Sequence, residues 1–214
     1  MNAIKENDGL KFLGLKLDKS LNWKNHIDKL LPKLSSACFV IRSMLSHCNT
    51  TIIKTIYFAY FHSILEYGIA FWGNFTESVK VFKLQKRVIR LMTGYNVRAS
   101  CRPLFPRLGI MTLSSQYIFS LMRFLSQNLQ LHTFNLNIHN YSTRCRIQLH
   151  KPSTALTLYQ KVLYYESVSI YNKLPYNIGE LILQNKGFLT NLKKYLLEKT
   201  FYSVEEYMND LLDG

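Results

Sequence analysis

SVKVFKLQKRVIRLMT, residues 78–93, is the stretch that decides the fold class. At about 100° per residue, its apolar side chains and its cations fall on opposite sides of a helix. The cations share one arc of about 120° and are Lys80, Lys83, Lys86, Arg87 and Arg90. The apolar side is formed by Val81, Leu84, Val88, Ile89, Leu91 and Met92. Gly94 follows as a natural stop, so the stretch predicts one amphipathic helix.

Helical periodicity returns along most of the chain. It predicts further helices over residues 22–45, 51–72, 112–127, 159–174, 187–199 and 203–212. Thr50 or Thr51 is expected to cap the second of these and Thr112 the third, while Ser203 with Glu206 matches a capping box. Residues 100–109 and 129–152 are expected to be loop, short turn or extended chain.

Two features of the first third of the chain work against a simple helical pattern. Pro32 lies inside the predicted helix 22–45, where it should kink the helix or restart it near Leu31. Residues 11–18 partly alternate between apolar and polar and predict one strand, which Gly14 would weaken. Because a single strand is not stable alone, it must pair nearby or lack its natural partner. The fold class expected is therefore mainly α, with one short N-terminal β-strand or hairpin.

The charge of the chain is concentrated in its middle. The chain carries 27 basic and 13 acidic residues, for a net charge of +14. Between residues 78 and 165 there are thirteen lysines and arginines and no carboxylate. Solubility is better served by interspersed signs, so this imbalance indicates a polyanionic partner, most commonly nucleic acid. The residues expected to contact phosphates are Lys80, Lys83, Lys86, Arg87, Arg90, Arg98, Arg102 and Arg107.

Catalytic and metal-binding patterns are not found. The aspartates are scattered, so no carboxylate set suited to two Mg²⁺ ions is visible, and there is no Gly-rich phosphate loop and no HExxH motif. His139 and Cys145 lie near one another but fall far short of a zinc site. His62 and Ser63 suggest a buried hydrogen-bonded pair more than a base and its nucleophile. We therefore predict no catalytic residue, no metal site and no cofactor.

Composition also bears on the compartment and on membranes. The four cysteines have wide, irregular spacing, which fits a reduced compartment, and the N-terminus has no stretch typical of a signal peptide. The most apolar stretch, residues 55–72, is interrupted by His62, Ser63 and Glu66, which favours a buried helix over a membrane span. We expect an intracellular protein of the nucleus or cytoplasm, not secreted and not bound to a membrane.

A series of short motifs in a fixed order carries a family resemblance. In chain order they are KFLGLKLD (11–18), Trp23 with His26-Ile27, KLSSA (33–37), His62-Ser63, Tyr67-Gly68, Trp72-Gly73, LQKRVIR (84–90), CRPLF (101–105), LGI (108–110), YSTR (141–144) and YNKLP (171–175). Together they resemble the C-terminal part of reverse transcriptases from non-LTR retrotransposons of the jockey-like kind. The resemblance covers nearly the whole chain from Lys11 and is more specific than any single motif.

The resemblance implies a division of the chain and a role for each part. Residues 1–20 would be the end of the polymerase palm, residues 21–110 a helical, bundle-like thumb that holds the template–primer duplex, and residues 111–214 a helical C-terminal region. The family's catalytic aspartates lie upstream of the matching part. The resemblance thus implies a truncated RNA-directed DNA polymerase that is not an enzyme as an isolated chain and retains nonspecific binding of RNA or RNA–DNA duplex.

Two other interpretations stay open at this stage. The chain could be a helical module that binds protein, for instance an intact reverse transcriptase, because an unpaired strand edge invites another strand. It could also be an element remnant that has no function.

Overall fold

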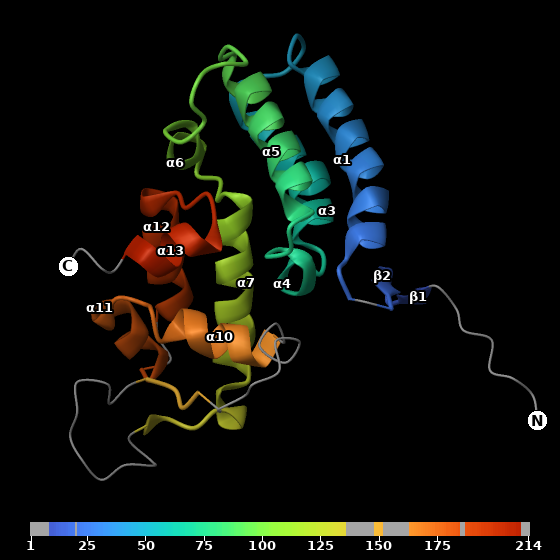
Figure 1. Ribbon diagram of the computed structural model, residues 1–214. Coiled ribbons are helices and arrows are strands. Elements are labelled where there is room, and N and C mark those ends of the chain that lie inside the picture. The colour runs from blue at the N-terminus through green and yellow to red at the C-terminus, as the bar shows by residue number, and fades with distance from the viewer. Residues whose placement is uncertain (1–8, 20, 136–147, 152–162, 185–186, 211–214) are drawn as a thin grey trace, which may run out of the picture. The chain divides into compact units, whose positions relative to one another are not determined.

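The computed structural model describes residues 9–19, 21–135, 148–151, 163–184 and 187–210. The chain is mainly helical and has a two-stranded hairpin near its N-terminus, which confirms the expected fold class (Figure 1). It divides into two compact units, residues 1–108 and 109–214. Each unit buries its own set of apolar side chains.

The first unit begins with an antiparallel hairpin of β1 (Gly9–Phe12) and β2 (Leu15–Asp18). The turn between them places Leu13 and Gly14 at φ 45° and 83°. Two successive positive φ angles are typical of the tight turn that suits a hairpin, and glycine adopts them without strain. The prediction of one strand over residues 11–18 is therefore wrong, because Gly14 belongs to a turn and the partner strand precedes it.

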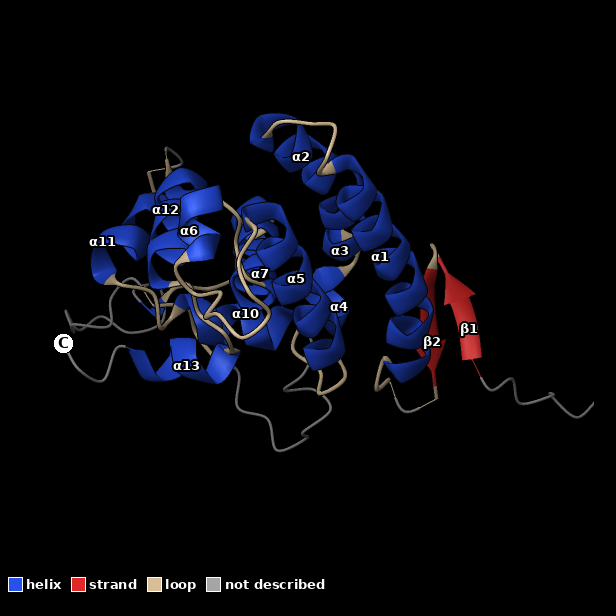
Figure 2. Ribbon diagram, turned by 90° about the horizontal axis from the view of Figure 1, so that it is seen from above, coloured by secondary structure: helices blue, strands red, loops and turns tan. Residues whose placement is uncertain are grey.

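The side chains of Asp18 and Asn22 stabilise the turn between β2 and the first helix. Asp18 Oδ1 accepts a hydrogen bond from the Asn22 backbone N–H at 2.9 Å, and Asn22 Oδ1 accepts one from the Lys24 N–H at 3.0 Å. Such bonds from Asp and Asn to backbone two to four residues on stabilise a turn. They set the start of α1 (Lys24–Met44) beside β2 (Figure 2).

α1 runs without interruption through Pro32, so the expected restart near Leu31 is wrong. Proline removes one backbone hydrogen bond from a helix, at a cost of about 3 kcal/mol. On α1, however, the apolar face stays in phase on both sides of Pro32. Its buried residues are Ile27, Leu30, Leu34, Ala37, Cys38 and Ile41. Burial of such side chains contributes about 1.5–3 kcal/mol each and outweighs the lost bond.

The predicted helix 51–72 is interrupted. It consists of α2 (Thr50–Ile56), the π-helical η1 (Tyr57–His62), α3 (Ser63–Glu66) and α4 (Ile69–Trp72). Asn49, rather than Thr50 or Thr51, is the N-cap, since its side chain accepts from the Ile52 N–H. Gly68 breaks the run at φ 66°, where a Cβ would lie 2.7 Å from the Leu15 side chain. Glycine is favoured there because the backbone is left-handed and the Leu15 side chain of β2 lies close to it.

α5 (Ser78–Thr93) has the predicted bounds and ends at Gly94, which is left-handed at φ 69°. It lies side by side with α1 in both ribbon views (Figures 1 and 2). The predicted apolar positions Val81, Val88, Ile89 and Met92 are buried, whereas Leu84 and Leu91 are half-buried. Packing also buries Phe82 and Gln85, two positions that the pattern did not assign to the core.

Two side-chain contacts add to the packing of α5 against the rest of its unit. Gln85 Nε2 donates to the buried Tyr57 hydroxyl at 3.2 Å. The Phe82 ring stacks on Phe105, with ring centres 6.3 Å apart, and Phe105 belongs to α6 (Leu104–Leu108). Residues 100–109, expected to be loop or a short turn, thus include a short helix.

The second unit is built around α7 (Leu113–Gln127), which contacts three other helices of the unit. The remaining elements are η2 (Leu129–Leu131), α10 (Leu163–Tyr171), α11 (Tyr176–Gly179), η3 (Glu180–Ile182), α12 (Phe188–Lys199) and α13 (Val204–Asn209). Helices were predicted at α7, α10, α12 and α13, whereas α11 was not predicted. An isolated antiparallel bridge joins Phe134 to Leu149. His139 and Cys145 lie outside the described residues.

Both predicted caps of this unit are confirmed. Thr112 Oγ1 accepts from the Ser115 N–H at 3.1 Å, and Ser203 Oγ accepts from the Glu206 N–H at 3.0 Å. The Glu206 side chain then accepts from the Tyr202 N–H at 2.7 Å, one residue before the position expected in a capping box. Searched over the described residues, the helices include none whose length and apolar character would allow it to cross a bilayer.

Candidate nucleic-acid interface

α5 presents a cationic arc because its opposite side is held in the core of the first unit. Val81, Val88 and Ile89 are fully buried, which fixes the rotation of the helix about its axis. The predicted cations then lie on the outer side, with Lys83 and Arg87 exposed and one turn apart. Neither side chain forms an ion pair or a hydrogen bond with any described residue. Lys83 and Arg87 are therefore the residues best placed to meet a phosphate.

Lys80 differs from its neighbours because carboxylates surround it. Its Nζ lies 2.5 Å from Glu77 Oε2 and 3.7 Å from Asp28 Oδ1 of α1. The hydrogen bond that Lys80 donates to Glu77 raises the pKa of Lys80 and lowers the pKa of Glu77. The stretch 78–93 carries no carboxylate of its own, so these two partners come from the residue before α5 and from α1. Lys80 would have to give up these partners to bind a phosphate.

Two further cations of the arc also take part in local packing. Lys86 Nζ lies 4.7 Å above the ring of Phe82, within the range of a cation–π contact. Arg90 donates its Nε–H to the Ala99 carbonyl at 2.9 Å. A guanidinium has five N–H donors, so Arg90 keeps four for a ligand while this bond holds the following loop against α5. Both side chains are half-buried, which limits their rotation.

The loop after α5 brings the remaining predicted arginines into the same unit. Cys101 is buried, and its Sγ–H donates to the Lys86 carbonyl at 3.5 Å. Arg98 and Arg102 lie on either side of Cys101 in the sequence and are exposed, as is Arg107 on α6. Together with the Arg90–Ala99 bond, the Cys101 contact draws the arginine-bearing loop to the Lys86–Arg90 edge of α5. We give the name α5 basic surface to five exposed cations and two half-buried ones, which are Lys83, Arg87, Arg98, Arg102 and Arg107 with Lys86 and Arg90.

One side chain at this surface was not singled out from the sequence. Tyr95 follows the Gly94 stop and is 48% exposed, three residues before Arg98. An exposed aromatic ring beside cations is able to stack on an unpaired base. Its position directly after a helix stop, in a basic stretch, was the signal available in the sequence.

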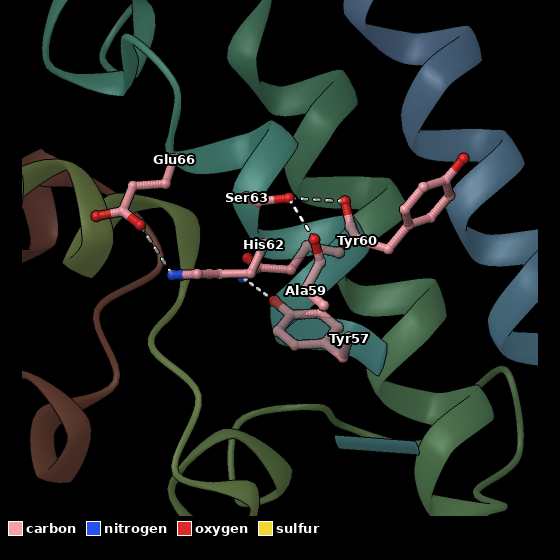
Figure 3. A network of polar contacts seen from close by, with 7 residues as sticks. Tyr57, Ala59, Tyr60, His62, Ser63 and Glu66 are labelled. Atoms are coloured by element: carbon pink, nitrogen blue, oxygen red, sulfur yellow. Dashed lines mark hydrogen bonds and ion pairs between the residues drawn. The ribbon is translucent and has the colours of Figure 1, made fainter. Parts of the chain in front are cut away.

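The predicted His62–Ser63 pair is not formed. Ser63 is exposed, and its hydroxyl donates to the carbonyls of Ala59 at 2.7 Å and Tyr60 at 3.3 Å. His62 Nε2 instead lies 3.6 Å from Glu66 Oε2 on the next turn. Figure 3 shows the two side chains pointing in different directions. The Ser63 hydroxyl is therefore turned away from the His62 imidazole and is not placed as a nucleophile beside its base would be.

The described residues also give no grouping of three or more His, Cys, Asp or Glu side chains suited to a metal ion. The thiol of Cys38, near Arg87, is protonated at neutral pH because burial raises its pKa to about 11.

Against known proteins the chain has no significant match, whether to a family model, to a curated protein or to a solved structure. The interface is therefore argued from its own residues.

Proposed function

We propose that the first unit binds nucleic acid without reading its sequence, through phosphate contacts made by the α5 basic surface. The observation that carries this proposal is the exposure of Lys83 and Arg87, which no described carboxylate neutralises, on a helix held firmly by its buried side. Lysine and arginine on such a face bind the phosphate backbone of a nucleic acid and release its counterions, which is a contact that does not depend on the base sequence.

The family resemblance supports the same proposal. A reverse transcriptase thumb grips the template–primer duplex, and residues 21–110 resemble that part. The ligand we propose is therefore RNA or an RNA–DNA duplex. We assign binding, and no step of DNA synthesis, to the residues of this chain.

Charge reversal on α5 tests the proposal. We expect Lys83→Glu with Arg87→Glu to weaken binding of an RNA–DNA duplex by about 100-fold at low salt, because two attractive contacts become repulsive. The measurement is fluorescence anisotropy over a salt series. For two lost phosphate contacts, the slope of log affinity against log salt should become less steep by about 1.8.

The matched control is Lys193→Glu with Lys194→Glu, which makes the same charge change at two exposed positions of α12. This variant should bind far more tightly than the α5 variant. If the two variants lose affinity equally, net charge rather than the α5 basic surface explains binding, and the proposal is wrong.

The exposed strand β1 favours a second function, the binding of a protein that adds a strand to the hairpin. Among the described residues β1 pairs with β2 alone, so its outer edge is open. Leu10, Phe12 and Leu13 are 60%, 58% and 72% exposed. An open edge with apolar side chains suits strand addition. Such binding would resist salt and need no RNA, so the same salt series separates the two functions.

A further inference from the structure

A second group of cations lies where the hairpin packs on α1. Lys11 and Lys16 stand directly opposite each other in the antiparallel register of β1 and β2, so their side chains share one face. Lys29 and Lys33 are one helical turn apart on α1. In both pairs like charges are neighbours, an arrangement that costs stability.

Lys16 and Lys29 bring the two pairs together. Their side-chain nitrogens lie within hydrogen-bonding reach of each other, and this contact, followed by desolvation, lowers the pKa of Lys29. Two ammonium groups are both donors and offer no acceptor. Solvent reaches both side chains, so water can accept from each ammonium group, but one anion that accepts from both would also offset their repulsion.

Buried packing, rather than the lysines, sets this geometry. The Lys16 backbone N–H donates to His26 Nδ1 at 3.4 Å. The His26 ring is buried against two tryptophans, with ring centres 6.0 Å from Trp23 and 6.2 Å from Trp72. Since β2 and α1 are joined through these rings, the backbones of Lys16 and Lys29 are held close whatever their charges.

Among the residues that the structure describes, the two carboxylates close in sequence form no ion pair with these lysines, although Asp18 Oδ2 has no hydrogen-bond partner of its own. Asp28 is adjacent to Lys29 but lies about 100° around the helix, where it pairs with Lys80 of α5. Asp18 is two residues from Lys16, and its Oδ1 accepts from the Asn22 backbone N–H. Across the described residues, neither carboxylate forms an ion pair with Lys11, Lys16, Lys29 or Lys33.

We propose that Lys16 and Lys29, flanked by Lys11 and Lys33, form a phosphate-binding site distinct from the α5 basic surface. The oxygens of one phosphate group accept from both ammonium groups, so that a repulsive contact becomes two charge-assisted hydrogen bonds. The phosphate belongs to a free oligophosphate or to the backbone of a nucleic-acid strand. Both sources offer the same oxygens to the same pair of lysines.

The test is an NMR titration of the full chain with labelled lysine side chains, using tripolyphosphate as the probe. We expect the signals of Lys16 and Lys29 to move together and the pKa of Lys29 to rise towards the ordinary lysine value when phosphate binds. Lys16→Gln and Lys29→Gln should each weaken binding by about tenfold, the effect of one charge-assisted hydrogen bond. Lys54→Gln, on α2, is the control and should bind as the unchanged chain does.

A second titration, with a short single-stranded oligonucleotide, identifies the source of the phosphate. Binding of tripolyphosphate alone assigns the site to free oligophosphates, and movement of Lys16 and Lys29 with the oligonucleotide assigns it to a nucleic-acid backbone. The Lys83→Glu, Arg87→Glu chain should still bind tripolyphosphate at Lys16 and Lys29. The site at Lys16 and Lys29 and the α5 basic surface can therefore fail independently of each other. The site is refuted if Lys16 and Lys29 do not respond to either probe, or if Lys54→Gln weakens binding as much as Lys29→Gln.

Discussion

α5 and α7 are both amphipathic helices rich in polar side chains, yet they use them differently. On α5, Lys83 and Arg87 project outward and make no bond to the described part of the chain. At the start of α7, Thr112, Ser114 and Ser115 are buried. In that order, their hydroxyls donate hydrogen bonds to the carbonyls of Phe201 at 2.5 Å, Tyr202 at 3.0 Å and Leu196 at 3.4 Å. These bonds attach the start of α7 to the C-terminal end of α12 and to the loop that follows α12.

This difference shows that polarity alone does not mark a binding surface. The polar groups of α7 satisfy backbone carbonyls that burial would otherwise leave without partners, so they contribute to the stability of the second unit. Lys83 and Arg87 of α5 have no such task among the described residues. Substitutions should therefore separate the two helices, with changes in folding on α7 and changes in binding on α5.

The largest effect is expected from Thr112→Val. This change keeps the shape of the side chain but removes the cap of α7 and the donor to Phe201, so the free energy of unfolding should fall by about 2–3 kcal/mol. Urea-induced unfolding measures it. The control is Thr93→Val on α5, whose hydroxyl donates only to helix carbonyls three and four residues back and whose loss should cost less than about 0.5 kcal/mol. Equal losses would contradict the comparison.

A smaller effect should distinguish two lysines of α5 from each other. Lys83→Ala is expected to weaken duplex binding by about fivefold, as for one contact of about 1 kcal/mol. Lys80→Ala should change affinity less than about twofold, because Glu77 and Asp28 already bind that ammonium group. Anisotropy at one low salt concentration measures both variants. A larger loss for Lys80→Ala would mean that nucleic acid displaces the two carboxylates.

The smallest effect concerns pH and involves one histidine in each unit. Burial lowers the pKa of His26 and of His132 below the ordinary value of 6.5, and Lys33 adds to the shift of His26. Above pH 6.5 the neutral form therefore dominates in both the folded and the unfolded chain, so titration of these histidines does not change the free energy of unfolding there. As pH falls through 6.5 the unfolded chain takes up protons first, and the free energy of unfolding should decrease.

Urea unfolding between pH 7.5 and pH 5.5 tests this, because most carboxylates stay ionised there. His26→Gln and His132→Gln should each make the dependence on pH shallower. The two rings have different neighbours. His26 Nδ1 accepts a hydrogen bond from the Lys16 backbone N–H, whereas the His132 ring stacks on the Tyr164 ring, with ring centres 4.4 Å apart. If neither variant changes the slope, buried histidines do not explain acid sensitivity.

Much of the candidate surface was predictable from the sequence. Helical spacing placed Lys83, Lys86, Arg87 and Arg90 on one arc, and they lie on one side of α5 with the predicted bounds. The pattern did not predict which cations would be engaged. Asp28 is 52 positions from Lys80, and Ala99 reaches Arg90 only because the loop folds back, so neither contact has a local signal.

The sequence by itself determined the mainly helical class, the bounds of α5 and the caps at Thr112 and Ser203. Those features depend on side chains within about one helical turn of each other, whose interactions a short stretch of sequence contains. Only the tertiary structure decided that α1 continues through Pro32, that Gly14 makes a turn, and that Lys16 meets Lys29. Each of these depends on burial against a segment distant in sequence, and the free energy of that burial is large enough to override a local preference.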